Sequence, residues 1–160
     1  MQKEVVMPIQ SGIQAPDFSL PDETNSTRRL SDFRGRPVVL YFYPKDDTTG
    51  CTTEACGFRD DYSAYVKADL VVLGVSPDSP ESHVKFKEKY SLPFPLLADD
   101  GHKVCSAYGA WGLKKNYGRE YEGVLRTTFL IDSKGRIAKV FENVKPAEHS
   151  AEVLEAAKNL

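Results

Sequence analysis

The sequence predicts an α/β protein in which a central mixed β-sheet carries helices on both faces. Two internal segments, 38–43 and 70–76, are apolar at nearly every position. Such segments are typical of parallel strands that helices cover on each side. Segments with helical periodicity alternate with them, and the resulting order, β-α-β-α-β-α-β-β-α, indicates a layered domain. We expect residues 1–160 to form one domain, since a chain of this length can bury its own core.

The N-terminal part is expected to contribute an arm and a hairpin. Residues 1–11 are expected to form a loose arm. An extended segment over 12–20 then leads into a hairpin, because the polar stretch 21–26 is rich in turn-forming residues. One helical turn is expected over 30–33, directly before the first central strand.

The middle of the chain supplies the alternating helices. A helix is expected to begin at about Cys51, because aromatic residues recur at helical spacing over 58–65. A second helix is expected to follow the strand 70–76, with Ser79 as its N-cap and Pro80 at its first position. Further short elements, a strand and a helix, are expected at 96–97 and 102–108.

The C-terminal part is expected to add a long loop, a hairpin and a last helix. Residues 111–123 are polar and contain glycine, which predicts a loop long enough to be functional. The segments 127–131 and 136–141 flank a short connection that ends in Gly135, which predicts a β-hairpin. The last helix is expected to begin at Pro146. Its buried face is expected to consist of Val153, Leu154, Ala157 and Leu160.

Composition and charge exclude several classes of protein. The chain has 41% hydrophobic and 28% charged residues, which is ordinary for a globular protein. Its formal net charge of −2 gives no reason to expect nucleic acid or an anionic membrane as a partner. No apolar segment approaches the roughly 18–20 residues of a membrane span. Residues 1–8 lack the apolar core of a signal peptide, so we expect a cytoplasmic protein.

The cysteines are three in number, at positions 51, 56 and 105. A secreted disulfide scaffold would pair an even number of them. In a reducing compartment cysteines are catalytic, metal-binding or merely buried, and composition does not choose among these. The spacing Cys51-x₄-Cys56 with a distant Cys105 lacks the tight pairs and the fourth ligand of a zinc site. We therefore expect neither a metal nor an organic cofactor.

The segment 43–56 combines the features that activate a thiol. A strand ends, a polar loop follows, and a helix begins with Cys51 in its first turn. Backbone N–H groups are unpaired there and the helix dipole favours negative charge, so the thiolate form is favoured. Thr48 can present a hydroxyl toward the sulfur or toward an oxygen bound to it. Pro44 has no N–H group and would shield the pocket from water.

At these residues the chain resembles a known family. The pattern Pro44-x-x-x-Thr48-x-x-Cys51 resembles the active-site signature of the peroxiredoxins. The string over 51–60, CTTEACGFRD, is similar to the peroxiredoxin Q, or bacterioferritin comigratory protein, subfamily of atypical two-cysteine enzymes. The similarity extends over nearly all of residues 11–160. It implies a thioredoxin-like fold, the reduction of hydrogen peroxide and organic hydroperoxides, and an antioxidant role in cell redox homeostasis.

The resemblance also implies roles for individual residues. Cys51 is implied to be the peroxidatic cysteine, with Thr48 and the Cys51 N–H binding the peroxide oxygens and Pro44 shielding the sulfur. Arg126 is implied to be the cation that stabilises the oxygen leaving with developing negative charge. The product on Cys51 is a sulfenic acid. Glu54 either orients Arg126 or only occupies the first helical turn, where acidic residues are favourable.

Cys56 then becomes the candidate resolving cysteine, which would form a disulfide with Cys51. On an intact helix, residues five apart have Cα atoms about 8.6 Å apart, whereas disulfides need Cα separations mostly below about 7 Å. We therefore predict that the first turns of this helix unwind on oxidation. The resemblance implies that a thioredoxin-like donor reduces the bond, and it favours a monomer. Cys105 is expected to be a core residue.

Two other functions remain open. A general thiol–disulfide oxidoreductase shares the fold but normally carries Cys-x-x-Cys, which this sequence lacks. A non-enzymatic redox sensor or holdase would expose a partner surface on oxidation. Catalytic consumption of hydrogen peroxide with thioredoxin separates a peroxidase from both. The sequence determines neither the preferred peroxide nor the physiological reductant.

Overall fold

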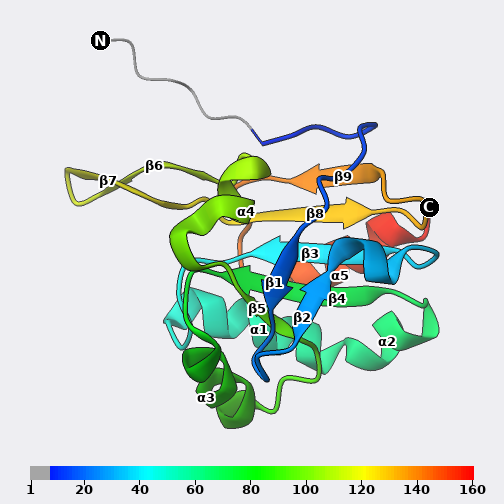
Figure 1. Cartoon of the computed structure of the whole chain (residues 1–160), viewed down its shortest axis with the longest axis horizontal. Coiled ribbons are helices and arrows are strands. Elements are labelled where there is room, and N and C mark those ends of the chain that lie inside the picture. The colour runs from blue at the N-terminus through cyan, green and yellow to red at the C-terminus, as the bar shows by residue number, and fades with distance from the viewer. Residues whose placement is uncertain (1–7) are drawn as a thin grey trace.

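A five-stranded mixed sheet forms the centre of the computed structural model, which describes residues 8–160 apart from the side chain of Asn116 (Figure 1). The strand order is β5-β4-β3-β8-β9. β3, β4 and β5 run parallel, whereas β8 is antiparallel to both β3 and β9. The strands are β3 (Val38–Phe42), β4 (Val71–Ser76), β5 (Leu96–Ala98), β8 (Thr127–Ile131) and β9 (Ile137–Phe141).

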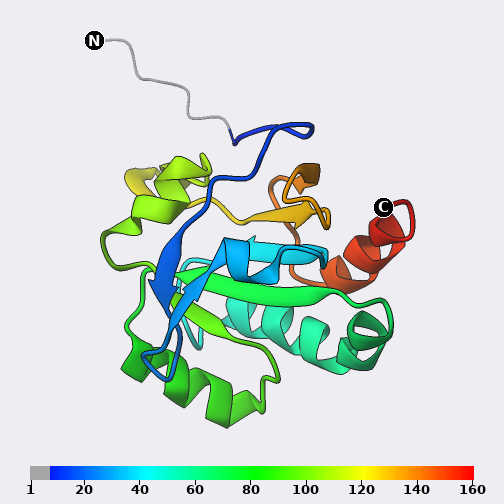
Figure 2. The same ribbon diagram turned by 45° about the vertical axis from the view of Figure 1, so that its right-hand side comes forward.

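Layers cover both faces of this sheet (Figures 1 and 2). Successive side chains of β3 point to opposite faces, so Leu40 and Tyr41 belong to two separate hydrophobic clusters. The Tyr41 face packs against α1 (Thr49–Asp60), α2 (Tyr62–Lys67), α3 (Pro80–Tyr90) and α5 (His149–Ala157). The Leu40 face packs against β1 (Ser19–Pro21), η1 (Leu30–Phe33) and α4 (Lys103–Ala107). Every position of β3, β4 and β8 is buried, which explains the apolar runs of β3 and β4.

The predicted helix starts at α1 and α3 are confirmed. α1 begins at Thr49, so Cys51 lies in its first turn. α3 begins at Pro80, and the side chain of Ser79 caps it by accepting a hydrogen bond from Ser82 N at 3.2 Å. The hairpin that the polar tip 21–26 predicts is also confirmed, since β1 pairs antiparallel with β2 (Thr27–Arg29). A single 3₁₀ turn, η2 (Asp100–His102), precedes α4.

The prediction of a loop over 111–123 is wrong. The segment forms a second antiparallel hairpin, β6 (Trp111–Asn116) and β7 (Arg119–Val124), which projects from the body on the left of Figure 1. Its turn residues Tyr117 and Gly118 both have positive φ, 52° and 77°, as a tight two-residue hairpin turn requires. The polar composition misled the prediction because most of β7 is exposed and needs no buried apolar face.

The predicted start of the last helix is also wrong. α5 begins at His149 rather than at Pro146, because Glu148 takes a left-handed conformation with φ 66°. Val153 is buried and Leu154 packs beside it as predicted. Leu160 is 49% exposed and does not belong to that buried face.

The N-terminal segment is held by the body of the protein where the structure describes it. Residues 1–7 of the expected arm lie outside the described part. Ile9 N donates to Tyr108 O at 3.1 Å, and Gly12 N donates to Ile137 O at 2.7 Å. Within residues 8–160, no helix has both the length and the apolar character that crossing a membrane requires.

Candidate active site

Cys51 lies where the sheet, the loop after β3 and the start of α1 meet. Its side chain is buried, with 1% exposed, and packs on the α1 side of the sheet. The first bond of the helix runs from Thr52 N to Thr48 O at 2.8 Å. The N–H of Cys51 therefore precedes the helical ladder and is available as a donor beside its own sulfur.

The side chain of Arg126 contacts the sulfur of Cys51. It stands directly before β8, which pairs with β3 and so brings the residue to the same end of the sheet as Cys51. Its Nη2 donates to Cys51 Sγ at 3.4 Å, and its Nη1 donates to Glu54 Oε1 at 2.8 Å. One guanidinium thus contacts both the thiol and a carboxylate, and the fixed planar fork makes this double contact possible.

Glu54 is buried, with 1% of the residue exposed. Burial raises the pKa of Glu54 to about 7, although the charge of Arg126 and its hydrogen bond act in the opposite direction. Oε2 of Glu54 and the hydroxyl of Tyr41 meet no hydrogen-bond partner within residues 8–160. Glu54 contacts Arg126 directly and lies beyond the first turn of α1, so the expectation that it only occupies that turn is wrong.

The stability of the protein should depend on pH through Glu54. Its pKa is raised on folding, so the contribution is complete below about pH 4.5 and is lost as pH rises through about 7. We expect the free energy of unfolding to fall over this range by about 3 kcal/mol more than in Glu54→Gln. Chemical denaturation of both proteins from pH 4.5 to 8 measures the difference. Glu88→Gln, on the exposed face of α3, should behave as wild type. Parallel curves for wild type and Glu54→Gln would contradict the expectation.

Gly50 leaves the space in which Arg126 approaches the sulfur. A Cβ atom built at Gly50 would stand 3.2 Å from Arg126 Nη2 and 3.5 Å from Pro146 Cγ. The first distance is tighter than an ordinary contact, and Glu54 prevents the guanidinium from moving freely. A larger residue at position 50 in the first turn of α1 would therefore press against the Arg126 guanidinium.

Gly50→Ala is expected to slow the reaction of Cys51 with peroxide by about tenfold, since small misplacements of catalytic groups have large effects on rate. The same change should leave stability unchanged or raise it by up to about 1 kcal/mol through helix propensity. Gly57→Ala, in the same helix, is the matched control because its Cβ would meet Ser150 Cβ at an ordinary 3.7 Å. Single-turnover kinetics of Cys51 oxidation distinguish the two variants. Equal rates in Gly50→Ala and Gly57→Ala would contradict the steric argument.

The loop between β3 and α1 carries Pro44 and Thr48. Pro44 is half-buried, and Thr48 is exposed at the N-cap of α1. The Thr48 hydroxyl donates to Lys45 O at 2.9 Å. Because the hydroxyl hydrogen of Thr48 is used in this bond to the backbone, the lone pairs of the hydroxyl oxygen remain available to accept a hydrogen bond.

A buried polar network anchors this loop to α3. The Asp46 carboxylate accepts from Tyr43 Oη at 2.6 Å and from Ser82 Oγ at 2.8 Å, and its Oδ2 lies 2.6 Å from His83 Nδ1. His83 Nε2 lies 2.9 Å from the carbonyl oxygen of Leu97. Both ring nitrogens of His83 therefore lie within hydrogen-bond distance of oxygen atoms. This network fixes the backbone between Pro44 and Thr48.

The three cysteines are free thiols and occupy different environments. Cys56 lies within intact α1 and is half-buried. Cys105 belongs to the hydrophobic cluster on the opposite face of the sheet from Cys51, and its thiol donates to Ala110 O at 3.1 Å. Burial raises the pKa of Cys105 to about 12, with a further contribution from the charge of Asp99. Cys105 is thus a core residue, as its sequence context predicts.

The projecting hairpin brings a second cation, Lys114, toward the site. Its side chain is half-buried, and its Cδ would lie 3.3 Å from a Cβ atom built at Gly123, three residues before Arg126. Burial and the neighbouring Arg126 together hold the pKa of Lys114 below its usual value, whereas Cys51 acts in the opposite direction. Sequence reasoning missed Lys114 because the segment was predicted to be a loop.

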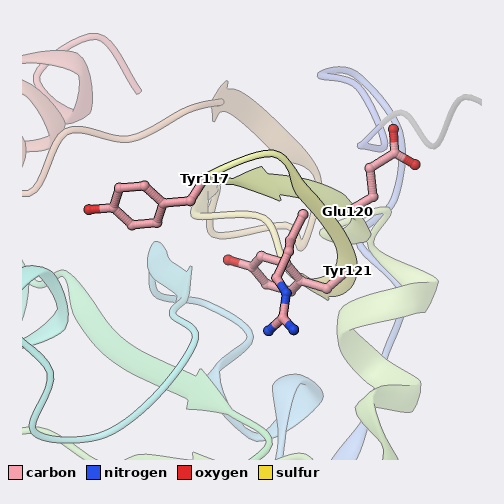
Figure 3. Close-up of a pocket in the computed structure, with 4 residues that line it drawn as sticks. Tyr117, Glu120 and Tyr121 are labelled. Carbon is pink, nitrogen blue, oxygen red and sulfur yellow. The ribbon is translucent and has the colours of Figure 1, made fainter.

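A hollow of about 500 Å³ lies farther out on the same hairpin and is lined by Tyr117, Arg119, Glu120 and Tyr121 (Figure 3). The residues discussed above for the Cys51 site do not line it, so this hollow is separate from that site.

Within the part of the chain that the structure describes, no three His, Cys, Asp or Glu side chains come together as metal ligands.

Sequence reasoning also missed the loop anchor and the role of Gly50. His83 follows Asp46 by 37 residues, and no local pattern links the two. Gly50 could have been suspected, because a glycine inside the first helical turn is unfavourable unless a close approach requires it. Cys51, Glu54 and Arg126 are brought together as the sequence predicted, and Thr48 and Pro44 flank them on the loop.

The Cys51 thiol lies at a helix N-terminus and accepts a hydrogen bond from an arginine. On a mixed sheet of this topology, such a site is that of a cysteine-dependent oxidoreductase. Comparison with known proteins makes the assignment specific. The chain matches the AhpC/TSA family over residues 11–140 and belongs to that family. It is similar to peroxiredoxin Bcp of Bacillus subtilis, with 53% identity over 96% of this chain and 98% of the relative. With peroxiredoxin Bcp of Escherichia coli the identity is 46%, over 92% and 94% of the two chains.

Solved structures agree with this assignment. The bacterioferritin comigratory protein of Xanthomonas campestris superposes with a TM-score of 0.87 at 35% identity, covering 93% of this chain and 98% of that one. BcpB of Mycobacterium tuberculosis gives a TM-score of 0.84 at 33% identity, covering 95% and 98%. The fold is therefore thioredoxin-like, as in these peroxiredoxins, and the chain is a thiol-dependent peroxidase that acts on peroxides and is recycled by a thiol reductant.

Proposed function

We propose that Cys51 is the peroxidatic cysteine and that Arg126, Thr48 and Pro44 form its peroxide pocket. The observation that carries this proposal is the hydrogen bond from Arg126 Nη2 to Cys51 Sγ at 3.4 Å, made at the N-terminus of α1. A cation and unpaired N–H groups beside one sulfur favour the thiolate. Cys105, buried and bonded to a carbonyl oxygen, lacks such surroundings.

In the first step, the Cys51 thiolate attacks the terminal oxygen of a hydroperoxide, R–O–O–H. The S–O bond forms while the O–O bond breaks, so the sulfur is oxidised to a sulfenic acid, Cys51–S–OH, and the peroxide is reduced. The leaving group, R–O⁻, takes a proton from solvent and becomes an alcohol, or water when R is hydrogen. Arg126 and the N–H of Cys51 stabilise the negative charge that develops during this displacement.

Thr48 and Pro44 orient the peroxide. The Thr48 hydroxyl donates to Lys45 O, so its oxygen can accept the hydrogen of the peroxide O–H group. Pro44 presents carbon atoms and no N–H, which limits access of water to the thiolate. Because Asp46 is held by α3 between these two residues, the loop is pre-organised for binding.

In the second step, the Cys56 thiol attacks the sulfenic acid, and a Cys51–Cys56 disulfide and water are formed. The burial of Cys105 on the opposite face of the sheet supports Cys56 as the resolving residue. The bond requires α1 to unwind, because residues five apart on a helix are too distant. Hydrogen bonds to α3 hold the chain on both sides of the segment that must open. Before it, the Asp47 carboxylate accepts from Lys89 and Tyr90; after it, Arg59 Nη1 donates to Tyr90 O. Opening should therefore be confined to about residues 48–58.

A thioredoxin-type dithiol then reduces the disulfide and returns both thiols. The substrates are hydrogen peroxide and organic hydroperoxides, in line with the alkyl peroxide reduction studied in the Xanthomonas campestris relative. The protein acts as a monomer, the state that the resemblance to the peroxiredoxin Q subfamily favours. Three free cysteines are in keeping with a cytoplasmic location.

The test combines turnover with disulfide mapping. The protein should consume hydrogen peroxide catalytically with thioredoxin, and the peroxide-treated protein should carry a Cys51–Cys56 bond by peptide mass spectrometry. Hydrogen exchange should then rise over residues 48–58 and not in α3. A Cys51–Cys105 bond would overturn the resolving role of Cys56, and an unchanged exchange pattern in α1 would overturn the unwinding. Stoichiometric oxidation without turnover would favour a redox sensor, and disulfide exchange without peroxide turnover would favour a general oxidoreductase.

A further inference from the structure

Lys114 is a half-buried cation without an anionic partner. It is on β6 of the projecting hairpin, where its cross-strand partner is Tyr121. Its ammonium lies over the Tyr121 ring, 5.9 Å from the centroid. Within the described residues, no carboxylate forms an ion pair with it. A partly desolvated charge of this kind is unfavourable unless another group can offset it.

The register of the hairpin separates charges onto its two faces. Cross-strand partners and alternate residues share a face, so Lys114, Tyr121 and Arg119 lie on one side. The acidic residues Glu120 and Glu122 lie on the other side, where Lys115 forms an ion pair with Glu120 at 3.7 Å. Figure 3 shows Tyr121 and Glu120 pointing away from each other across the strand. The face that carries Lys114 is therefore basic and aromatic.

A pair of glycines at the base of this face directs Lys114 toward the active site. Gly112 and Gly123 are cross-strand partners and leave this part of the face without side chains. A Cβ atom at Gly123 would stand 3.3 Å from Lys114 Cδ, so the lysine stem lies across the glycine. Gly123 precedes Arg126 by three residues. Because its stem lies across Gly123, Lys114 lies on the part of the hairpin that leads back to Arg126. Burial and the charge of Arg126 lower the pKa of Lys114, in agreement with this placement.

From this arrangement we propose that Lys114 is a specificity-determining residue that favours hydroperoxides carrying an anionic group, such as a carboxylate. The anionic group would contact the Lys114 ammonium while the O–O bond reaches Cys51, and an apolar body would lie against Tyr121. Arg126 is already bonded to Glu54 and the sulfur, and Arg119 lies at the far end of the hairpin beside the turn, so Lys114 is better placed to meet a substrate charge. This inference rests on the proposed role of Cys51, and it adds a substrate class to that role.

The first experiment does not depend on peroxidase activity. Reduced protein is alkylated with iodoacetate, which is anionic, or with iodoacetamide, which is neutral and nearly the same size, and peptide mass spectrometry follows each cysteine. Lys114→Gln is expected to lower the ratio of the two rates at Cys51 by about three- to tenfold at low salt. The ratio at Cys56 in the same samples serves as an internal reference and should not change.

Two further variants sharpen the test. Lys115→Gln removes a neighbouring charge from the opposite face of the hairpin, and its ratio at Cys51 should match wild type. Gly123→Val keeps the charge of Lys114 but fills the space under its stem, and it should lower the ratio as Lys114→Gln does. An unchanged ratio in Lys114→Gln, or an equal decrease in Lys115→Gln, would overturn the proposal. A normal ratio in Gly123→Val would overturn the placement of Lys114 by Gly123.

The second experiment measures the substrate preference itself. Cumene hydroperoxide and its 4-carboxylate derivative differ in charge but share the reacting group. Lys114→Gln should lower kcat/KM for the carboxylate by about three- to tenfold and should change that for the neutral peroxide by less than about twofold. Equal losses for both peroxides would overturn the specificity role. If neither peroxide is consumed by the wild-type protein, the proposed peroxidase mechanism fails, whereas the alkylation ratio still reports on Lys114.

Discussion

Replacing Cys51 with serine is expected to abolish peroxide turnover, with a loss of about 10³-fold or more. A serine hydroxyl is not ionised near neutral pH, and neither the start of α1 nor Arg126 can make it a comparable nucleophile. The two side chains have nearly the same size, so the buried site should remain packed and Arg126 should keep its bond to Glu54. A thioredoxin-coupled assay that follows NADPH oxidation measures the loss.

The other two cysteines provide matched controls for this substitution. Cys56→Ser should still form the sulfenic acid in a single turnover, which a dimedone adduct detects by mass, but it should lose thioredoxin-supported turnover. Cys105→Ser should keep the turnover rate within about twofold, because the residue is buried on the opposite face of the sheet. Full turnover in Cys51→Ser, or its loss in Cys105→Ser alone, would show that the nucleophile has been assigned incorrectly.

Replacing Arg126 with methionine is expected to slow the reaction of Cys51 with peroxide by about 10²- to 10³-fold, the range found when one donor to a developing oxyanion is removed. The same change should lower stability, because it leaves the buried carboxyl group of Glu54 without its partner. Stopped-flow oxidation kinetics measure the first effect, and chemical denaturation measures the second.

A double variant separates the two effects of Arg126. Arg126→Met combined with Glu54→Gln removes the unpaired carboxyl, so stability should recover while the peroxide rate stays low. Arg126→Lys keeps a charge but loses the planar fork that contacts Sγ and Oε1 together, and its rate should fall between those of wild type and Arg126→Met. If the double variant recovered the peroxide rate, Arg126 would act only through stability.

The correct predictions of secondary structure depend on strong local patterns in the sequence, which the segments predicted wrongly lack. The buried strands and the start of α1 are strong local signals, because a strand covered on both faces must be apolar at every position. The hairpin over 111–124 was missed because its exposed strands have no apolar alternation to reveal them. The start of α5 was misplaced because a left-handed residue, Glu148, intervenes after Pro146.

The sequence by itself indicated Cys51 as the candidate nucleophile, since a strand, a loop and a helix start are local features that lie within a few residues of it. It also identified Thr48 and Pro44 as its neighbours and Arg126 as its cation through the family resemblance. The predictions for Thr48, Pro44 and Cys51 depend on a motif whose residues are close in the chain, whereas that for Arg126, 75 residues from Cys51, depends on the family resemblance.

Only the tertiary structure decided how distant residues complete the site. Strand pairing between β3 and β8 brings Arg126 to Cys51, and the packing of α3 brings His83 to Asp46. The β6–β7 hairpin lays the stem of Lys114 across Gly123, three residues before Arg126. The sheet also places Cys105 on the face opposite Cys51, which favours Cys56 as the resolving partner. Such contacts depend on register and on which face of the sheet a side chain occupies, and no local pattern in the sequence encodes either for residues this far apart.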